Sequence, residues 1–209
     1  MGIAERKERE KEIRREQIMT AATQLFMSKG FNSTKIEEIA KKAELSPALI
    51  YQYFKNKDDL FATLHLVDLE HLNRIIKKKI SDKKLPAEQK LLQIKDAFYE
   101  NYIAHPTLVK NIMHVQLEDT LPNVSSEVAK KLSAEGKKAQ RALSEVFSEG
   151  VRNKIFKPRN PIAVADALWA IFTGLVVWEG AKMKSNPEKD FLKPTLDMAF
   201  EVFCNGLKS

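Results

Sequence analysis

The sequence is poor in the residues that hold small or irregular proteins together. One cysteine, Cys204, occurs among 209 residues, which excludes a disulfide framework and an all-cysteine metal cluster. Only 7 glycines and 8 prolines are present, and this excludes collagen-like and proline-rich chains. A lone cysteine is typical of a reducing compartment, so we expect a cytoplasmic protein.

Motifs of catalysis and metal binding are missing as well. The sequence has no glycine-rich phosphate loop, no G-x-S-x-G and no H-E-x-x-H pattern. No two of the four histidines lie four residues apart, the spacing that places two ligands on one helical face. They are His65, His71, His105 and His114. We therefore expect neither an enzyme nor a metal or other cofactor.

Long hydrophobic runs are limited to residues 161–178, in which Asp166 is the only charge. The run is near the lower limit of length for a membrane span. Because Asp166, Thr173 and Gly174 interrupt it, we expect a buried or interface helix and no membrane contact. Residues 1–16 carry six basic side chains interleaved with five glutamates, unlike a signal peptide. Two interpretations of that stretch stay open, a solvated extension of the first helix and a contact to DNA.

Helical periodicity dominates what remains, and it predicts an all-α protein of about nine helices. Ile18, Ala22, Leu25 and Phe26 mark the first helix, which we expect Gly30 to end. We expect the second helix to begin at Thr34, with Glu37 completing a capping box. The later helices are predicted at about 47–54, 57–80, 86–104, 107–120, 124–153, 161–184 and 189–207.

Residues 34–54 read as helix, tight turn, helix, the unit whose second helix enters the DNA major groove. Ser46 is a good N-cap and Pro47 suits the first helical position. Ile50 and Phe54 are expected to pack inward, while no acidic residue occurs between Leu45 and Lys57 to repel phosphates. The net charge of +7 also fits a polyanionic partner. An ordinary helical hairpin with half-buried tyrosines stays open at this point.

Specific residues resemble the N-terminal domain of TetR-family transcriptional regulators. They are Gly30-Phe31, Thr34, Ile39-Ala40-Lys41-Lys42-Ala43 and the run Ser46-Pro47-Ala48-Leu49-Ile50-Tyr51-Gln52-Tyr53-Phe54-Lys55-Asn56-Lys57-Asp58-Asp59-Leu60. A weaker resemblance lies in Glu149-Gly150-Val151-Arg152, Phe156, Asn160-Pro161 and Thr173-Gly174. Together the two resemblances imply a helix-turn-helix DNA-binding domain at 1–57 and a helical ligand-binding and dimerisation domain at 58–209.

The resemblance also implies roles for individual residues. Thr34 and Lys35 would contact the DNA backbone at the start of the second helix. Bases would be faced by Pro47, Ala48, Leu49 and Gln52, behind the N-cap Ser46, and phosphates would be held by Tyr51, Tyr53 and Lys57. Since Ser46-Pro47-Ala48 departs from the frequent Ser-Lys-Gly, the base preference of relatives does not transfer.

Further expectations concern the second domain. Members of the TetR family are mostly homodimeric repressors that bind palindromic operators and are released by a small molecule. Candidate ligand contacts are Phe98, Tyr102, Ile112, Met113, Leu117, Phe147, Trp169 and Phe172. The ligand would be small and largely apolar, with a fatty-acyl compound as one option because 107–156 resembles fatty-acyl-responsive members. The homodimer would form through helices 161–184 and 189–207. An alternative function is a DNA-bound protein-interaction factor without a small-molecule inducer.

Overall fold

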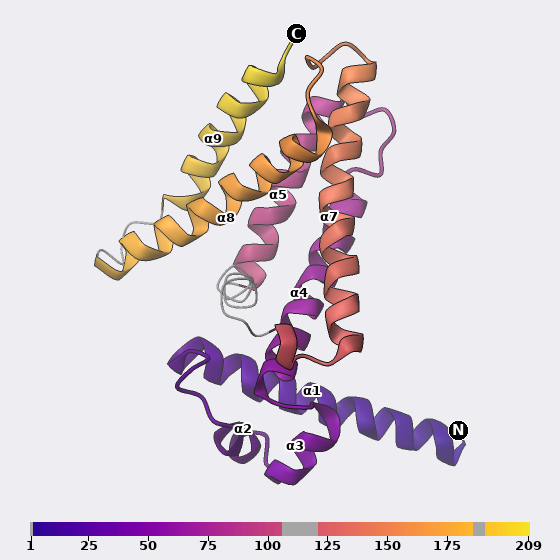
Figure 1. The fold of residues 1–209 in the computed structure, drawn as a ribbon, viewed down its shortest axis with the longest axis vertical. Helices are drawn as coiled ribbons and strands as arrows, with labels where there is room; N and C mark the ends of the chain where they lie inside the picture. Colours follow the sequence, from indigo (N-terminus) through magenta and orange to yellow (C-terminus); the bar gives the residue numbers. More distant parts are fainter. Residues whose placement is uncertain (1, 106–120, 186–190) are drawn as a thin grey trace. The chain divides into compact units, whose positions relative to one another are not determined.

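The structure, a computed structural model, describes residues 2–105, 121–185 and 191–209. These residues form eight α-helices and a short 3-10 turn at Leu121–Asn123, and no strand occurs among them. The all-α prediction is confirmed, and the predicted helix at 107–120 lies outside the described residues. The helices in Figure 1 are α1 (Ile3–Lys29), α2 (Ile36–Lys42), α3 (Pro47–Tyr53), α4 (Lys57–Lys79), α5 (Ala87–Ala104), α7 (Ser126–Arg152), α8 (Pro161–Ser185) and α9 (Leu192–Leu207).

The described residues divide into two compact units. Unit 1 holds residues 2–66 together with 121–131, and unit 2 holds 67–105, 132–185 and 191–209. The division falls inside α4, which therefore belongs to both units. The predicted boundary at residue 57 stays a prediction about where the DNA-binding function ends.

Unit 1 is built on the helices α1, α2 and α3, whose apolar faces meet in one core. Gly30 ends α1 as predicted, with a φ of 82° that the other residues rarely adopt. Two aromatic contacts hold the loop after it, because the Phe31 ring lies 5.5 Å from that of Phe26 and 4.7 Å from that of Phe61. The buried residues of this core are Ile18, Ala21, Ala22, Phe26, Ile36, Ile39, Ala40, Ile50, Phe54, Leu60, Phe61 and Leu64.

The predicted capping box between Thr34 and Glu37 is wrong. The Thr34 hydroxyl is buried and donates to the Gly30 carbonyl at 2.8 Å, so it does not cap α2. The helix begins two residues later at Ile36, and the Lys35 backbone N–H donates to the Glu38 carboxylate at 3.1 Å. The cap is shifted by one residue because the buried environment of Thr34 draws its hydroxyl toward the end of α1.

Unit 2 packs α5, α8 and α9 with the later parts of α4 and α7 around a larger apolar core. Aromatic rings fill its centre, where Phe98 lies 4.9 Å from Phe172 and Phe147 stacks on Phe156 at 5.6 Å. Ion pairs of buried lysines with partly exposed carboxylates join the helices at its margin: Lys90 of α5 contacts Glu149 of α7 at 2.8 Å, and Lys95 of α5 pairs with Asp197 of α9. Leaving one partner of such a pair unmatched would be costly.

Phe156 and the start of α5 approach α7 closely at Gly150. A Cβ atom at this position would lie 2.1 Å from a ring carbon of Phe156 and 3.1 Å from the Cβ of Ala87. The chain then turns at Lys154, whose φ of 58° is left-handed, and brings Phe156 into the core. A glycine is required here because there is no room for a side chain.

Helix α8 is largely apolar, although it carries the exposed Asp166, which accepts a hydrogen bond from Gln140 at 2.6 Å, and the buried Glu179. Residues Pro161–Lys182 are long and apolar enough to cross a membrane by length and composition, and 33% of that window is buried. A core or interface helix meets the same description. Its buried side contributes Val164, Ala165, Leu168, Phe172 and Val176 to the core of unit 2. The opposite side remains exposed, and it includes Ile162, Ala170, Gly174, Val177 and Trp178.

Candidate functional site

The tight turn between α2 and α3 fixes the angle at which α3 leaves the core. Glu44 takes a left-handed conformation with a φ of 56°, a cost that non-glycine residues bear only where the surrounding structure holds them. The Leu45 N–H donates to the Ala40 carbonyl at 2.9 Å, which closes the end of α2. The connection spans residues 43–46, where the sequence predicts a tight turn.

Helix α3 is short, and its two ends are both well defined. The Ser46 hydroxyl accepts a hydrogen bond from the Leu49 N–H at 3.2 Å, and Pro47 occupies the first helical position. Ile50 is fully buried and Phe54 is 2% exposed, so both predicted anchors are confirmed. These anchors and the cap leave the opposite side of the helix facing solvent.

The exposed side of α3 carries the residues predicted to face DNA. Tyr51 is 53% exposed, and Leu49 and Tyr53 are half-buried, with Tyr53 packed partly against the core of unit 1. The other outward residues are Ser46, Pro47, Ala48 and Gln52, all exposed. Lys35 and Lys55, which flank this surface in the chain, are exposed too. The side offers hydroxyls, an amide and methyl groups without a carboxylate, the chemistry that phosphates and base edges accept.

Two predicted contacts instead point into the protein. Thr34 is 1% exposed, and its hydroxyl is engaged with Gly30. The Lys57 ammonium donates to the carbonyls of Phe31 at 2.9 Å and Thr34 at 3.1 Å, and lies 4.2 Å from the centre of the Phe31 ring. In this structure both side chains shape the loop that leads into α2.

A polar cluster that the sequence did not predict joins the start of α4 to residues 123–125. The Asn56 side chain accepts from the Asp59 N–H at 2.8 Å and donates to the Asn123 carbonyl at 2.9 Å. Asp59 is 5% exposed, and its carboxylate accepts from the Ser125 N–H at 2.9 Å and the Lys55 N–H at 3.1 Å. Only the cap at Asn56 was visible in the sequence, because residues 59 and 125 lie far apart in the chain.

The candidate ligand contacts lie mostly in the core of unit 2. Phe98, Phe147 and Phe172 are fully buried, while Tyr102 and Trp169 are partly buried against the same core. Trp169 meets Phe98 edge to face at 5.3 Å. The remaining candidates, Ile112, Met113 and Leu117, lie outside the described residues.

A second polar cluster occupies unit 2 between α4 and the end of α5. The His71 ring nitrogen contacts the side-chain oxygen of Asn101 at 2.8 Å, and His105 contacts Asp68 at 2.9 Å. The two histidine rings meet edge to face at 5.1 Å. Asn101 is fully buried, and its amide nitrogen has no hydrogen-bond partner among the residues that the structure describes. An unpaired buried donor is costly unless something accepts from it.

Burial sets the protonation of the pair that Asp68 and His105 form. It raises the pKa of Asp68 to about 7 and lowers the pKa of His105, which the neighbouring His71 lowers further. The neutral hydrogen-bonded pair is therefore favoured over the ion pair just below neutral pH. Sequence spacing missed this cluster because Asp68 and His71 of α4 meet Asn101 of α5 and its C-cap His105 only in the folded chain.

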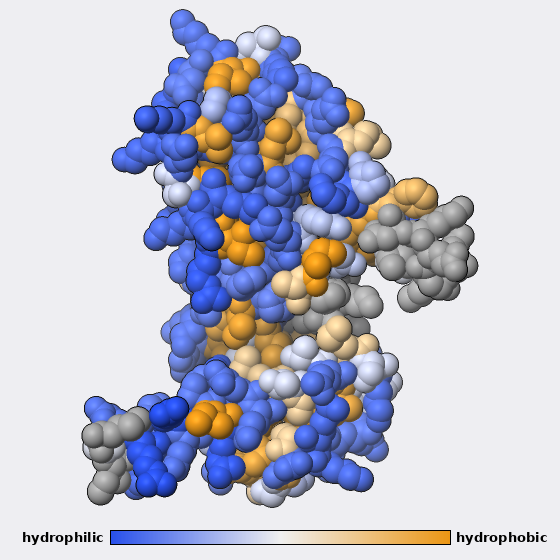
Figure 2. All heavy atoms as spheres, turned by 180° about the vertical axis from the view of Figure 1, so that it is seen from behind, coloured by the Kyte–Doolittle hydropathy of each residue, from blue (hydrophilic) through white to orange (hydrophobic). Residues whose placement is uncertain are grey.

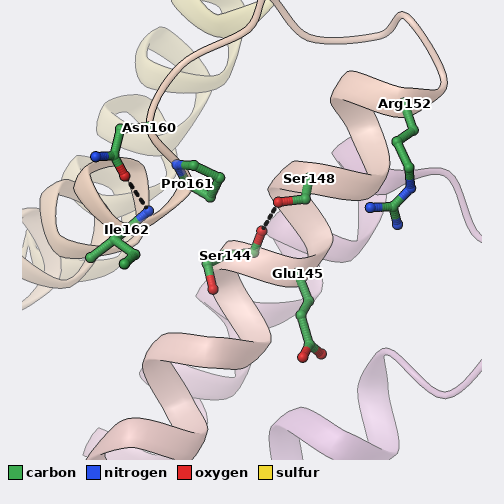
Figure 3. A pocket seen from close by; sticks show the side chains of 7 residues that line it. All are labelled: Ser144, Glu145, Ser148, Arg152, Asn160, Pro161 and Ile162. Atoms are coloured by element: carbon green, nitrogen blue, oxygen red, sulfur yellow. Dashed lines mark hydrogen bonds between the residues drawn. The ribbon is translucent and has the colours of Figure 1, made fainter.

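An open groove of about 400 Å³ separates α7 from the start of α8. Figure 3 shows the residues that line it, Ser144, Glu145, Ser148 and Arg152 on α7 and Asn160, Pro161 and Ile162 at the start of α8. The Asn160 side chain caps α8 by accepting from the Ile162 N–H at 3.0 Å. Ile162 belongs both to this groove and to the exposed side of α8, so the two surfaces are continuous.

Comparison with known proteins gives the site its context. A model of the family "Bacterial regulatory proteins, tetR family" matches residues 18–64, the span from α1 into α4. HbdR of Aromatoleum sp. (strain CIB), an HTH-type transcriptional regulator, is 46% identical over 79 residues, which cover 37% of this chain and 34% of HbdR. NicS of Pseudomonas putida (strain KT2440), an HTH-type transcriptional repressor, is 27% identical over 146 residues, 68% of this chain and 66% of NicS. Each match thus covers less than two thirds of the relative.

A solved structure extends the likeness to the whole fold. The transcriptional regulator FadR from Bacillus subtilis, in complex with stearoyl-CoA, superposes with a TM-score of 0.71 at 21% identity, covering 91% of this chain and 98% of that one. The tight turn and the capped, outward-facing α3 form a helix-turn-helix unit. Residues 18–64 match the TetR family of bacterial regulatory proteins, and the whole chain shares its fold with FadR.

Proposed function

We propose that this chain is a homodimeric repressor that reads a palindromic operator with α3 and is released by a small, largely apolar ligand. The observation that carries the DNA-reading role is the exposed side of α3, which is acid-free and anchored from behind by Ile50 and Phe54. A helix held this way enters a major groove without rearrangement of its core.

Each residue on α3 suits a particular contact. Gln52 fits adenine, which a glutamine can bind through two hydrogen bonds, and Ala48 and Leu49 fit thymine methyl groups. The Tyr51 hydroxyl, the Ser46 region and Lys35 fit phosphates, and Pro47 packs at the leading end of the helix. Thr34 and Lys57 act through the loop that they hold, and Tyr53 through its partly buried ring.

The exposed side of α8 supports the homodimer. It presents Ile162, Ala170, Gly174, Val177 and Trp178, with Trp178 64% exposed, and nothing lies within 4 Å of where a Gly174 Cβ would be. A second copy of α8 approaching at Gly174 would cover it through a two-fold, self-complementary contact. Helix α9, which packs beside α8 (Figure 1), adds exposed Met198 and Val202. On the other side of α9, Leu192, Leu196 and Phe200 are buried within the chain.

The ligand would be recognised in unit 2, with Asn101 as its polar anchor. The unpaired amide of Asn101 fits an oxygen of the ligand head, beside the largely apolar environment of Phe98 and Trp169. Fatty-acyl thioesters are one class of this description, and FadR binds stearoyl-CoA on the same fold. Ligand entry would displace α4, and it releases DNA only if the ligand binds the released state more tightly.

The DNA-reading role is tested by selecting an operator from random duplexes and comparing two glutamine variants. Gln52→Ala should weaken operator binding about 10- to 100-fold and relax the preference at one base position. Gln24→Ala, an exposed glutamine of α1, should leave binding unchanged. Equal binding by both variants would contradict the assignment of α3.

The ligand is tested by adding acyl-CoA thioesters of increasing chain length to the operator complex. We expect the operator affinity to fall at saturating thioester and the thermal midpoint of the free protein to rise. Asn101→Leu should reduce both responses. Operator affinity that stays constant at saturating thioester would exclude this ligand class and favour a protein partner instead.

A further inference from the structure

The first turns of α1 carry a strongly charged surface. This surface lies outside the side of α3 that is proposed to read DNA. Residues 4–14 are exposed and helical, and they contain Arg6, Lys7, Arg9, Lys11 and Arg14. In Figure 1 this part of α1 extends past α2 and α3, and in Figure 2 the projection at lower left carries mostly hydrophilic side chains.

The charges on this segment are sorted by side. At 3.6 residues per turn, Lys7, Lys11 and Arg14 fall on one line of the helix, and the same line continues to Ile18. We call Lys7, Lys11 and Arg14 the basic stripe. Glu5, Glu8 and Glu12 form a separate line beside it. Arg6 and Arg9 lie on the side of the helix away from the stripe. Arg6 pairs at 3.1 Å with Glu10, which follows Lys7 by three residues and precedes Arg14 by four and so adjoins the stripe.

The structure also fixes which way the basic stripe faces. Ile18 is fully buried in the core of unit 1, so the line points to the side of α1 that α2 and α3 cover further along. Arg15, next to the stripe, places its guanidinium 5.8 Å from the centre of the Phe54 ring, which caps α3. The basic stripe therefore begins near the C-terminal end of α3 and continues toward the N-terminus of α1. It lies on the same side of α1 as α3.

We propose that the basic stripe is a second DNA contact, which binds phosphates flanking the base pairs read by α3. The inference rests on the proposed DNA-reading role of α3. Three cations spaced one turn apart suit a phosphate backbone. The line of Glu5, Glu8 and Glu12 faces another direction, and Glu10, which adjoins the stripe, is paired with Arg6. Phosphate contacts add affinity and fix register without reading sequence. The partner is thus duplex DNA itself.

The test compares two double variants that remove the same charge from opposite sides of the helix. Lys7→Gln/Lys11→Gln breaks the basic stripe, while Arg6→Gln/Arg9→Gln leaves it intact, and glutamine keeps a similar helix propensity. Operator binding is measured from 50 to 300 mM salt on the selected duplex, with flanks either retained or removed. Equal circular dichroism and thermal midpoints establish that both variants fold.

We expect the stripe variant to bind about 10-fold more weakly at 100 mM salt, with the salt slope reduced by about 2 for each bound subunit. The opposite-side variant should match the wild type, and removing the flanks should abolish the difference. Equal affinities and slopes for both variants, or a loss that persists without flanks, would overturn the proposal. If the wild type selects no operator, the DNA-reading role of α3 fails instead.

Discussion

The two units of this chain expose opposite chemistry for opposite purposes. Unit 1 buries a small apolar core and presents α3 with hydroxyls, an amide and no carboxylate. Unit 2 buries a larger core and still leaves Val177, Trp178 and Val202 exposed on α8 and α9. A polar acid-free face suits a polyanion, whereas an apolar face suits another apolar face. Under the proposed function, the exposed side chains of each unit form a binding surface whose chemistry matches its partner, DNA for α3 and a second copy of the chain for α8 and α9.

The largest effect on assembly and operator binding is expected from a charge on the exposed side of α8. Ala170→Glu should convert the dimer to a monomer, because a charge would be buried unpaired at the two-fold contact. Sedimentation velocity should show the monomer, and operator affinity should fall at least about 100-fold, since one subunit cannot engage two half-sites. Ala134→Glu makes the same change at an exposed position of α7 and should leave the dimer intact. Ala170→Glu protein that remains dimeric would contradict the interface.

The stability of the protein should also respond strongly to a side chain added in the core of unit 2. Gly150→Ala places a methyl group 2.1 Å from Phe156 and should lower the free energy of unfolding by about 3 kcal/mol. Gly136→Ala in the same helix meets no atom within 4 Å and should raise it by about 0.5–1 kcal/mol. Urea denaturation measures both changes, and a destabilised Gly136→Ala protein would count against the packing described for α7.

The burial of His65 in α4 predicts that the stability of the protein depends on pH. Burial lowers the pKa of His65 to about 4, so between pH 4 and 6.5 the unfolded chain binds more protons than the folded one. The free energy of unfolding should therefore rise with pH across this window, by about 3 kcal/mol from His65. His65→Leu should flatten that rise, because the Nδ1 atom has no hydrogen-bond partner to lose. Parallel pH profiles for the two proteins would refute the assignment.

A smaller effect is expected at the start of α4. In Asp59→Asn one oxygen that accepts a backbone N–H becomes a donor, which should cost about 2 kcal/mol of unfolding free energy. Asp58→Asn changes the neighbouring, less buried carboxylate and should cost much less. Thermal unfolding of both variants provides the comparison, and equal midpoints would argue against the bonds to residues 55 and 125.

The sequence was informative where structure depends on neighbours in the chain. Gly30, Ser46, Pro47 and Asn56 each act within a few residues, and the ends that they set for α1, α3 and α4 were predictable. The inward anchors Ile50 and Phe54 followed from spacing alone.

Contacts between distant segments were out of reach of the sequence. The pairing of Asp59 with Ser125, and the meeting of His71 and His105, depend on how separate helices approach. Thr34 and Lys57 have residue types suited to phosphates, and only the fold shows that they bind the loop beside them. On α9, periodicity found the apolar face that the chain itself covers, while Met198 and Val202 lie on the face left open.

Hydrogen exchange of the protein with and without its selected operator tests the central claim most directly. The account predicts that operator binding slows exchange most strongly in residues 46–53, which form α3 and its cap. A protein that binds the duplex while residues 46–53 exchange at an unchanged rate would contradict the assignment of α3 as the DNA-reading helix.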